Sequence, residues 1–119
     1  MADSMKFAER LARLIDRKLG EDILILDLRA ASALADFFVI TTANSTVHAQ
    51  AIAQALLEKS KSRGFAPPHH VEGMDSAQWI LIDYLDVIVH IFLGEVREFY
   101  GLERLWGDVP QKRLDNRKR

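Results

Sequence analysis

Four histidines are the side chains in this sequence best suited to hold a metal ion, and two of them are adjacent, at positions 69 and 70. His69, His70 and Glu72 suggest a site, but neighbouring residues of an extended chain point to opposite faces and rarely share an ion. The sequence has no cysteine, and no two histidines stand at a helical ligand spacing. We therefore predict that the protein holds no metal ion and no cofactor.

Asp83 and Asp86 could form a carboxylate pair that binds magnesium for phosphoryl transfer. Such chemistry usually needs a glycine-rich loop that cradles the phosphates, and the sequence contains none. Aspartate is also common in turns, because its side chain bonds to the nearby backbone. No serine lies in a nucleophile-elbow motif, and cysteine is absent. The sequence therefore predicts no catalytic residue and a protein that is not an enzyme.

Aromatic and charged residues gather late in the chain, where they could form a surface that binds another protein. They are Trp79, Asp83, His90, Arg97, Phe99, Tyr100, Glu103 and Trp106. If residues 79–83 form a strand, Trp79 and Asp83 share one face, and a tryptophan beside a solvent-facing carboxylate is typical of an interface anchor. The competing interpretation makes Trp79 and Trp106 ordinary core aromatics whose ring N–H groups are bonded internally.

The spacing of apolar residues predicts the helices and strands that position these side chains. We expect helices over residues 4–19, from the cap candidates Asn44-Ser45-Thr46 to Gly64, and over 95–106, with strands over 23–28, 37–42, 70–72, 79–83 and 87–92. The order of these elements predicts an α/β sandwich with a mixed sheet.

Two details of this prediction concern the aromatic residues. The last two strands form a hairpin whose register the sequence leaves open, so the face that His90 occupies stays open as well. In the last helix, Gly101 predicts a kink or break. A spacing of three places Phe99 and Leu102 on one side of that helix and Tyr100 and Glu103 on another. Leu102 is therefore the weakest candidate contact, and Trp79 with Asp83 the firmest.

Charge is unevenly distributed along the 119 residues, although the net charge is only −1. Residues 21–111 hold thirteen acidic and six basic side chains, whereas residues 112–119 hold five basic and one acidic. An acidic body is a poor ligand for nucleic acid and a good match for a basic protein, although the basic tail could touch nucleic acid. The alternative interpretation is that the acidic residues only keep the domain soluble and bind no partner.

Length and hydropathy predict one domain over residues 1–108, followed by a flexible basic tail over 109–119. No window is apolar enough for a membrane span, and the N-terminus lacks the pattern of a signal peptide. The absence of cysteine fits a reducing compartment. We therefore expect a soluble cytoplasmic protein with no membrane partner.

The late segment also carries a family resemblance. Glu72-Gly73, Ala77 to Asp83 and Asp86 to Phe92 resemble the central signature of the bacterial ribosomal silencing factors of the Iojap family. Glu95, Arg97, Phe99-Tyr100, Leu102-Glu103 and Leu105-Trp106 continue the motif in order. Asp36, Phe38-Val39-Ile40, Asn44-Ser45-Thr46 and His48 are similar to the first half of the family. The resemblance covers residues 5–108.

This resemblance implies a nucleotidyltransferase-like αβα sandwich, with a mixed sheet of about five strands flanked by helices, that lacks the catalytic carboxylates. It implies binding to the fourteenth universal protein of the large ribosomal subunit, on the intersubunit face. The bound factor would keep the small subunit from joining, and so repress translation when nutrients are limited. The implied contacts are Trp79, Asp83, His90, Tyr100, Leu102 and Trp106, with Glu72, Glu95 and Glu103 as charge partners.

Two other functions stay open at this stage. Fold kinship alone favours a nucleotidyltransferase-like enzyme that acts on RNA or a nucleotide, although fold does not establish function. The tryptophan-rich surface could also pair with itself and form a homodimer when the protein is free.

Overall fold

The computed structural model describes residues 2–59, 62 and 65–114. The helices are α1 (Ala2–Arg17), α2 (Thr46–Lys59), α3 (Gly94–Tyr100) and α4 (Leu102–Leu105). The strands are β1 (Glu21–Asp27), β2 (Phe37–Ala43), β3 (His70–Glu72), β4 (Trp79–Asp83), β5 (Val87–Leu93) and β6 (Gln111–Leu114). Up to residue 105 their order is the predicted one, with the last helix divided in two.

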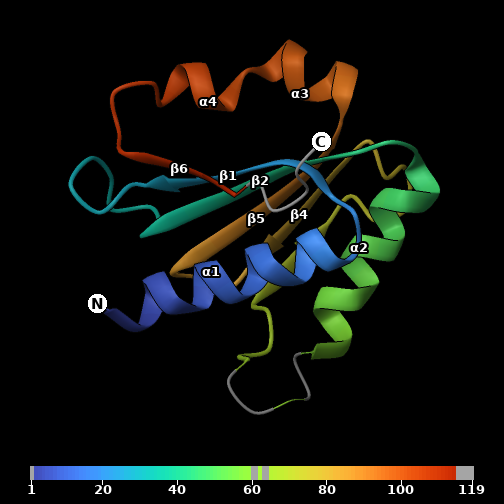
Figure 1. Cartoon of the computed structure of the whole chain (residues 1–119), viewed down its shortest axis with the longest axis horizontal. Coiled ribbons are helices and arrows are strands. Elements are labelled where there is room, and N and C mark those ends of the chain that lie inside the picture. Colours follow the sequence, from blue (N-terminus) through green and yellow to red (C-terminus); the bar gives the residue numbers. More distant parts are fainter. Residues whose placement is uncertain (1, 60–61, 63–64, 115–119) are drawn as a thin grey trace.

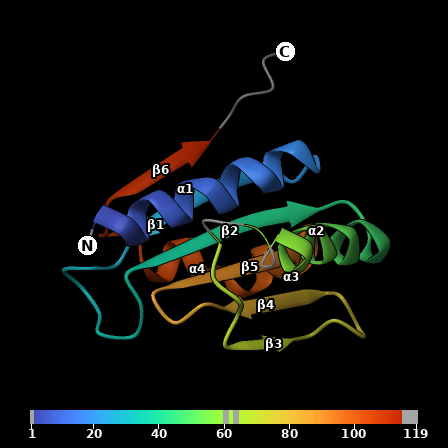
Figure 2. The same cartoon turned by 90° about the horizontal axis from the view of Figure 1, so that it is seen from below.

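The strands form one sheet whose two faces are covered by different helices. Figure 1 shows α1 and α2 on one face and α3 and α4 on the other. The strand order is β3-β4-β5-β2-β1-β6, which can be followed in Figure 2. β2 and β5 run parallel, and the other four neighbouring pairs run antiparallel. The predicted αβα sandwich with a mixed sheet is therefore confirmed, with six strands where five were predicted.

The two long helices follow from their sequences. In α1, Leu11, Leu14 and Ile15 are buried while the arginines between them are exposed, which is the division that helical spacing predicts. The helix ends at Arg17, and Gly20 then packs so closely against Ile15 that a Cβ there would overlap it. α2 begins as its cap candidates predict, because the Ser45 hydroxyl accepts a hydrogen bond from the backbone N–H of His48 at 3.0 Å.

The hairpin of β4 and β5 has a register that settles the position of His90. Trp79 lies opposite Phe92, Leu81 opposite His90, and Asp83 opposite Ile88. Since directly paired residues of neighbouring strands share a face, His90 lies on the same face of the sheet as Trp79. The turn that joins the strands contains no glycine and is held by Asp83, whose Oδ1 accepts the N–H of Leu85 at 2.7 Å.

Alternation along the strands divides the core into two clusters of unequal size. Beneath α1 and α2 the cluster includes twenty-one buried residues, to which β5 contributes Val87, Val89 and Ile91. Beneath α3 and α4 it includes nine, among them Ile88 and Phe92 of the same strand. Trp79, Leu81 and Trp106 pack only partly buried against the smaller cluster. The second face is therefore less completely covered than the first.

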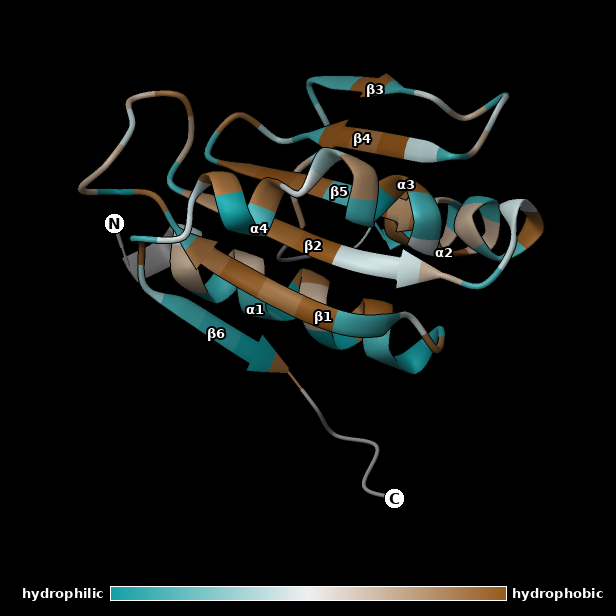
Figure 3. Cartoon of the chain, turned by 90° about the horizontal axis from the view of Figure 1, so that it is seen from above, coloured by the Kyte–Doolittle hydropathy of each residue, from teal (hydrophilic) through white to brown (hydrophobic). Residues whose placement is uncertain are grey.

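The end of the described chain departs from the predicted domain boundary at residue 108. Residues 111–114 form β6, which pairs antiparallel with β1, and the N–H of Asp27 donates to the carbonyl of Pro110 at 2.9 Å. Figure 3 shows the reason, since β1 and β5 are mostly hydrophobic while β6 is mostly hydrophilic. Backbone pairing to a free strand edge needs no apolar side chain, so a charged sequence gave no sign of it. The rest of the predicted tail, residues 115–119, lies outside the described residues.

Candidate protein-binding surface

Trp79, the first residue of β4, is the centre of an aromatic cluster that lies partly open to solvent. Its ring centroid is 4.8 Å from that of Phe92 and 4.7 Å from that of Tyr100. Its ring N–H donates to Nδ1 of His90 at 3.1 Å. The ring nitrogen is thus bonded internally, as the core interpretation predicted, while the residue as a whole stays partly exposed. Trp79 therefore combines features of a core aromatic residue and of a surface residue.

His90 supports this tryptophan from beneath. It is only 3% exposed, and the centroid of its ring lies 4.5 Å from that of Phe38. Burial lowers the pKa of His90 to about 4, because the charged imidazolium would lose its hydration. A neutral ring that accepts the Trp79 N–H on Nδ1 carries its own hydrogen on Nε2. His90 was predicted as a contact residue, and its burial instead gives it the role of holding Trp79 in place.

Gly101 separates two groups of aromatic and apolar side chains. It adopts a left-handed conformation with φ +59, which ends α3 and begins α4. Phe99 is 78% exposed and Tyr100 is 52% exposed, whereas Leu102 packs against the smaller core cluster. The prediction that Phe99 and Leu102 share a helical side is therefore wrong, because a side shared at a spacing of three requires an unbroken helix.

The exposed aromatic residues border a shallow hollow between β4 and α3. Its volume is about 410 Å³, and its lining residues are Ser76, Gln78, Trp79, Glu95, Val96, Phe99 and Tyr100. Glu95 is exposed and is the one charged side chain among these described lining residues. Apolar rings around a carboxylate suit a partner that offers an apolar side chain beside a basic one. We call these seven residues the aromatic groove.

A buried arginine anchors α3, which carries four of the seven groove residues, and the neighbouring helix α4. Arg97 is 5% exposed, and its Nε donates to Oε2 of Glu103 at 3.0 Å. Its Nη1 donates at 2.8 Å to the carbonyl of Asp22 and at 2.8 Å to the hydroxyl of Thr42. Arg97 of α3 thereby joins α4 to the ends of β1 and β2. Glu103 was predicted to pair with a partner, but its carboxylate is engaged inside the molecule.

The family model described as "RsfS: Ribosomal silencing factor during starvation" matches residues 1–119. The chain belongs to this family. A ribosomal silencing factor RsfS of Bacillus subtilis is 43% identical over 100 residues, which are 84% of each chain. A Mus musculus protein named mitochondrial assembly of ribosomal large subunit protein 1 is 30% identical over 100 residues, which are 82% of this chain and 44% of the mouse protein.

A solved structure has a similar fold. The crystal structure of a protein from Chromobacterium violaceum has a TM-score of 0.79 at 31% identity, and the match covers 90% of this chain and 86% of that one. The family model and the relatives therefore confirm the family resemblance that was predicted over residues 5–108, and the solved structure agrees with the mixed α/β fold that it implied.

The structure brings together only some of the residues that the family resemblance implied as contacts. Trp79, Tyr100 and Glu95 line the aromatic groove. Asp83 shares the face of Trp79 but stands four residues along β4, about 13 Å away at the usual rise of a strand. Glu72 is exposed on β3, where its Oε2 lies 2.7 Å from Nε2 of His70.

Two other implied contacts, Leu102 and Trp106, belong mainly to the smaller core cluster. Both are partly buried against it, and the Trp106 ring packs edge-on against Phe38 with centroids 6.3 Å apart. Phe99 lines the groove, although the sequence analysis grouped it with Leu102 on one helical side and did not include it among the implied contacts. Its position directly before Tyr100-Gly101 was the available signal, since a glycine break frees the preceding residues from the helical pattern.

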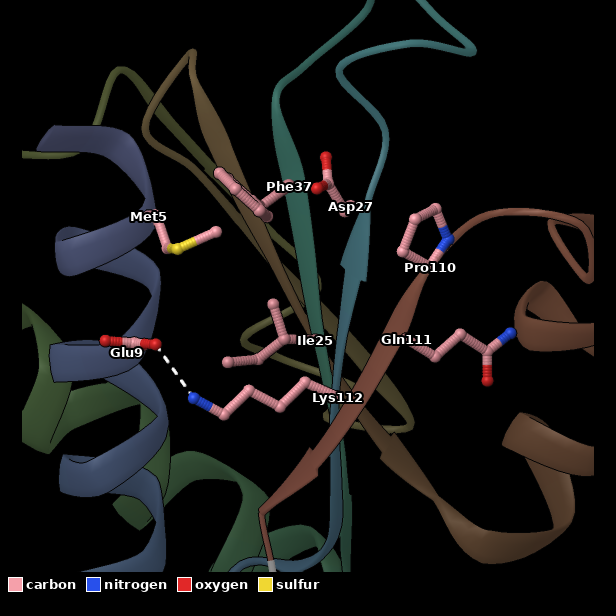
Figure 4. A pocket seen from close by; sticks show the side chains of 8 residues that line it. All are labelled: Met5, Glu9, Ile25, Asp27, Phe37, Pro110, Gln111 and Lys112. Atoms are coloured by element: carbon pink, nitrogen blue, oxygen red, sulfur yellow. Dashed lines mark hydrogen bonds and ion pairs between the residues drawn. The ribbon is translucent and has the colours of Figure 1, made fainter. Parts of the chain in front are cut away.

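A second hollow, of about 270 Å³, lies between α1 and β6 and is drawn in Figure 4. Ile25, Phe37 and Met5 form its apolar part. Nζ of Lys112 donates to Oε2 of Glu9 at 2.9 Å across it, and this bond lowers the pKa of the Glu9 carboxyl. Because Lys112 is paired with Glu9, and Asp27 is paired with Arg29 outside the hollow, this hollow has less to offer a partner than the aromatic groove.

No group of three or more histidine, cysteine, aspartate or glutamate side chains in residues 2–59, 62 and 65–114 could hold a metal ion. Over the same residues, no helix is long and apolar enough to cross a membrane.

Proposed function

We propose that this chain represses translation by binding a basic ribosomal protein on the intersubunit face of the large subunit and blocking the small subunit sterically. The family assignment supplies the ribosome as the setting, and the name of the mouse relative refers to the large ribosomal subunit. The partner we propose is the fourteenth universal protein of that subunit, as the family resemblance implied. The mechanism needs no chemistry, because two subunits cannot close over a rigid obstacle.

The observation that carries this proposal is the exposure of the aromatic groove. Phe99 is 78% exposed and Tyr100 is 52% exposed, and both line the same hollow as Trp79 of β4. Large aromatic side chains left in water are energetically costly, and they are enriched among the residues that dominate binding energy at interfaces. A carboxylate at their edge favours a basic partner, and ribosomal proteins meet that requirement.

The main test is sedimentation of the purified chain with isolated ribosomal subunits. The chain should travel with the large subunit and reduce the amount of large subunit that joins the small one. Trp79→Ala should weaken binding to the large subunit by about 2 kcal/mol or more, as truncation of a central aromatic residue does. If the chain stays at the top of the gradient, or subunits join equally well in its presence, the proposal is wrong.

Trp79 is partly buried, so a loss of binding in its variant could reflect a damaged fold. Glu95→Lys avoids this problem, because Glu95 is exposed and lines the groove. Glu98→Lys is the matched control, since Glu98 is exposed on the same helix but outside the groove. We expect Glu95→Lys to weaken binding and slow association, and Glu98→Lys to have a smaller effect on both. Equal effects would remove the groove from the proposal.

The two other functions, a nucleotidyltransferase-like enzyme and a self-pairing homodimer, are tested separately. The described residues contain no cluster of three carboxylate or histidine side chains for a metal-bound nucleotide, so we do not propose an enzyme. A thermal shift with magnesium and a nucleoside triphosphate checks this choice. Light scattering of the free chain tests self-pairing, and the Trp79→Ala and Glu95→Lys variants reveal whether a dimer uses the same groove.

A further inference from the structure

Positive charge gathers on the opposite side of the molecule from the aromatic groove, along α1. Arg10, Arg13 and Arg17 stand at helical spacing on its exposed side and span about 10 Å of the helix. The opposite side of the helix is buried, with Leu11 and Ile15 at 0% exposure. Burial of the apolar side therefore fixes the direction in which the three arginines point.

The arginines line two adjoining hollows between α1 and α2, the helices that cover the larger core cluster. The hollows have volumes of about 540 and 150 Å³ and share Leu14, Arg17 and Lys59. Five basic side chains are found among their described lining residues, and they are Arg10, Arg13, Arg17, Lys18 and Lys59. Glu58 is the one acidic residue in that set. We call this region the basic groove.

Helix stability explains only part of this arrangement. Arg17 and Lys59 lie in the last turns of α1 and α2, where a cation stabilises the negative end of the helix dipole. Arg10 and Arg13 lie in the middle of α1, where the dipole does not favour them. Their position across the groove from Lys59 concentrates positive charge in a concave surface, which attracts an anionic partner more strongly than scattered charges would.

We propose that the basic groove binds the phosphate backbone of ribosomal RNA while the aromatic groove holds a ribosomal protein. Arginine suits this role, because its planar guanidinium binds phosphate through two parallel hydrogen bonds. A membrane surface is a poorer match, since an interfacial helix needs an exposed apolar side and that of α1 is buried in the core. The choice of RNA as the anion rests on the proposed function, whereas the charge of the groove does not.

This inference refines the expectation that an acidic body makes little contact with nucleic acid. That expectation came from the sum of charges over residues 21–111, and four of the five basic side chains in the groove lie before that range, in α1 and directly after it. Folding brings Lys59 of α2 to the same place. The sign of the electrostatic potential at the groove therefore depends on which charged side chains lie side by side in the fold. The net charge of a sequence segment does not reveal it.

Fluorescence anisotropy with a labelled RNA duplex of about 20 base pairs tests the inference directly. The full chain should bind the duplex, with an affinity that falls steeply as salt rises. Arg13→Gln with Arg17→Gln should weaken binding about tenfold or more, and should lower the slope of log Kd against log salt by about two. Both positions are exposed, so circular dichroism should show an unchanged fold.

A charge-matched control separates the groove from overall charge. Arg29→Gln with Arg104→Gln removes the same two charges from exposed positions outside the groove, and this double variant should bind RNA nearly as well as the wild type. Equal loss in both double variants would overturn the inference, and so would wild-type affinity in the Arg13 and Arg17 variant. Binding to phosphatidylserine vesicles without binding to the duplex would also overturn it.

The Trp79→Ala variant separates RNA binding by the basic groove from the proposed binding to a ribosomal protein. That variant should lose affinity for the large subunit and keep its affinity for the RNA duplex, because Trp79 lies on the other face of the sheet. If the wild-type chain binds the duplex but not isolated large subunits, the proposed function fails while RNA binding stands. If the wild-type chain does not bind the duplex at low salt, the inference fails whatever happens with the subunits.

Discussion

The two faces of the sheet are built differently, although the same strands form both. Beneath α1 and α2 the contacts are mostly between aliphatic side chains such as Ile52 and Leu56, which are fully buried. Beneath α3 and α4 the packing includes His90 and Arg97, both buried, and aromatic rings that reach the surface. The first face has the composition of a stabilising core. The second face is less completely buried, and its exposed aromatic rings are available to a binding partner.

The largest effect is expected on the free energy of unfolding, from a substitution in the core beneath α1 and α2. Leu56→Ala should lower the free energy of unfolding by about 4 kcal/mol, because it leaves a cavity among fully buried side chains. Urea unfolding measures the loss, with Leu34→Ala at a 65% exposed position as the control. The folded fraction should keep its affinity for the large subunit. A variant that is as stable as the control would show that the first face is not the main source of stability.

The next effect is expected at the junction that anchors the second face. Arg97→Ala should lower the free energy of unfolding by about 3 kcal/mol, because the Glu103 carboxylate and the Thr42 hydroxyl lose their donor in a buried setting. Arg104→Ala, at an exposed position, should change it by less than about 0.5 kcal/mol. If both variants unfold at the same urea concentration, the buried network does not hold α3 and α4 in place.

A smaller effect should appear as a pH dependence that comes from the second face. The pKa of His90 is about 4 in the folded chain against an ordinary value of 6.5, so between these values the unfolded chain takes up a proton that the folded chain does not. Stability should therefore fall as the pH falls, by about 2 kcal/mol between pH 7.5 and pH 5 from this group alone. Urea unfolding of the wild type and of His90→Gln measures it as the difference between their pH dependences. Parallel pH curves would contradict the burial of a neutral His90.

The smallest change in free energy is expected for a surface side chain that affects binding alone. Phe99→Ala should weaken binding to the large subunit about tenfold, which is about 1.4 kcal/mol, and change the unfolding free energy by less than about 0.5 kcal/mol. Leu105→Ala is the control, because Leu105 is 72% exposed on α4 and lies outside the aromatic groove. The contrast between the faces would not hold if Phe99→Ala destabilised the fold as much as a core variant does.

The fold was largely predictable because its elements have strong local patterns. The apolar positions of α1 and the alternation of β4 fixed which side chains are buried, and both agree with the structure. β6 was missed because its charged residues pair through the backbone alone. Gly101 was recognised as a break, but its consequence for Phe99 was not, since the spacing rule was carried across the break.

The site was only partly predictable, for a different reason. Trp79, Tyr100 and Glu95 follow from residue types that favour interfaces, and the structure brings them together. The burial of His90 and the pairing of Glu103 with Arg97 depend on contacts between distant segments. Arg97, for instance, bonds to Asp22 and Thr42. No local pattern contains such contacts, so a sequence motif cannot distinguish the residues that touch a partner from those that position them.

The two edges of the sheet have a consequence for how the protein behaves at high concentration. β3 has only three residues, and β6 carries Lys112 and Arg113 on its exposed positions. A second copy that added its own β6 to this edge would bring like charges together, and β3 is too short to hold a long strand. Both edges therefore resist open-ended growth into fibrils, so the chain can display bare aromatic rings on one face without the sheet itself becoming a nucleus for aggregation.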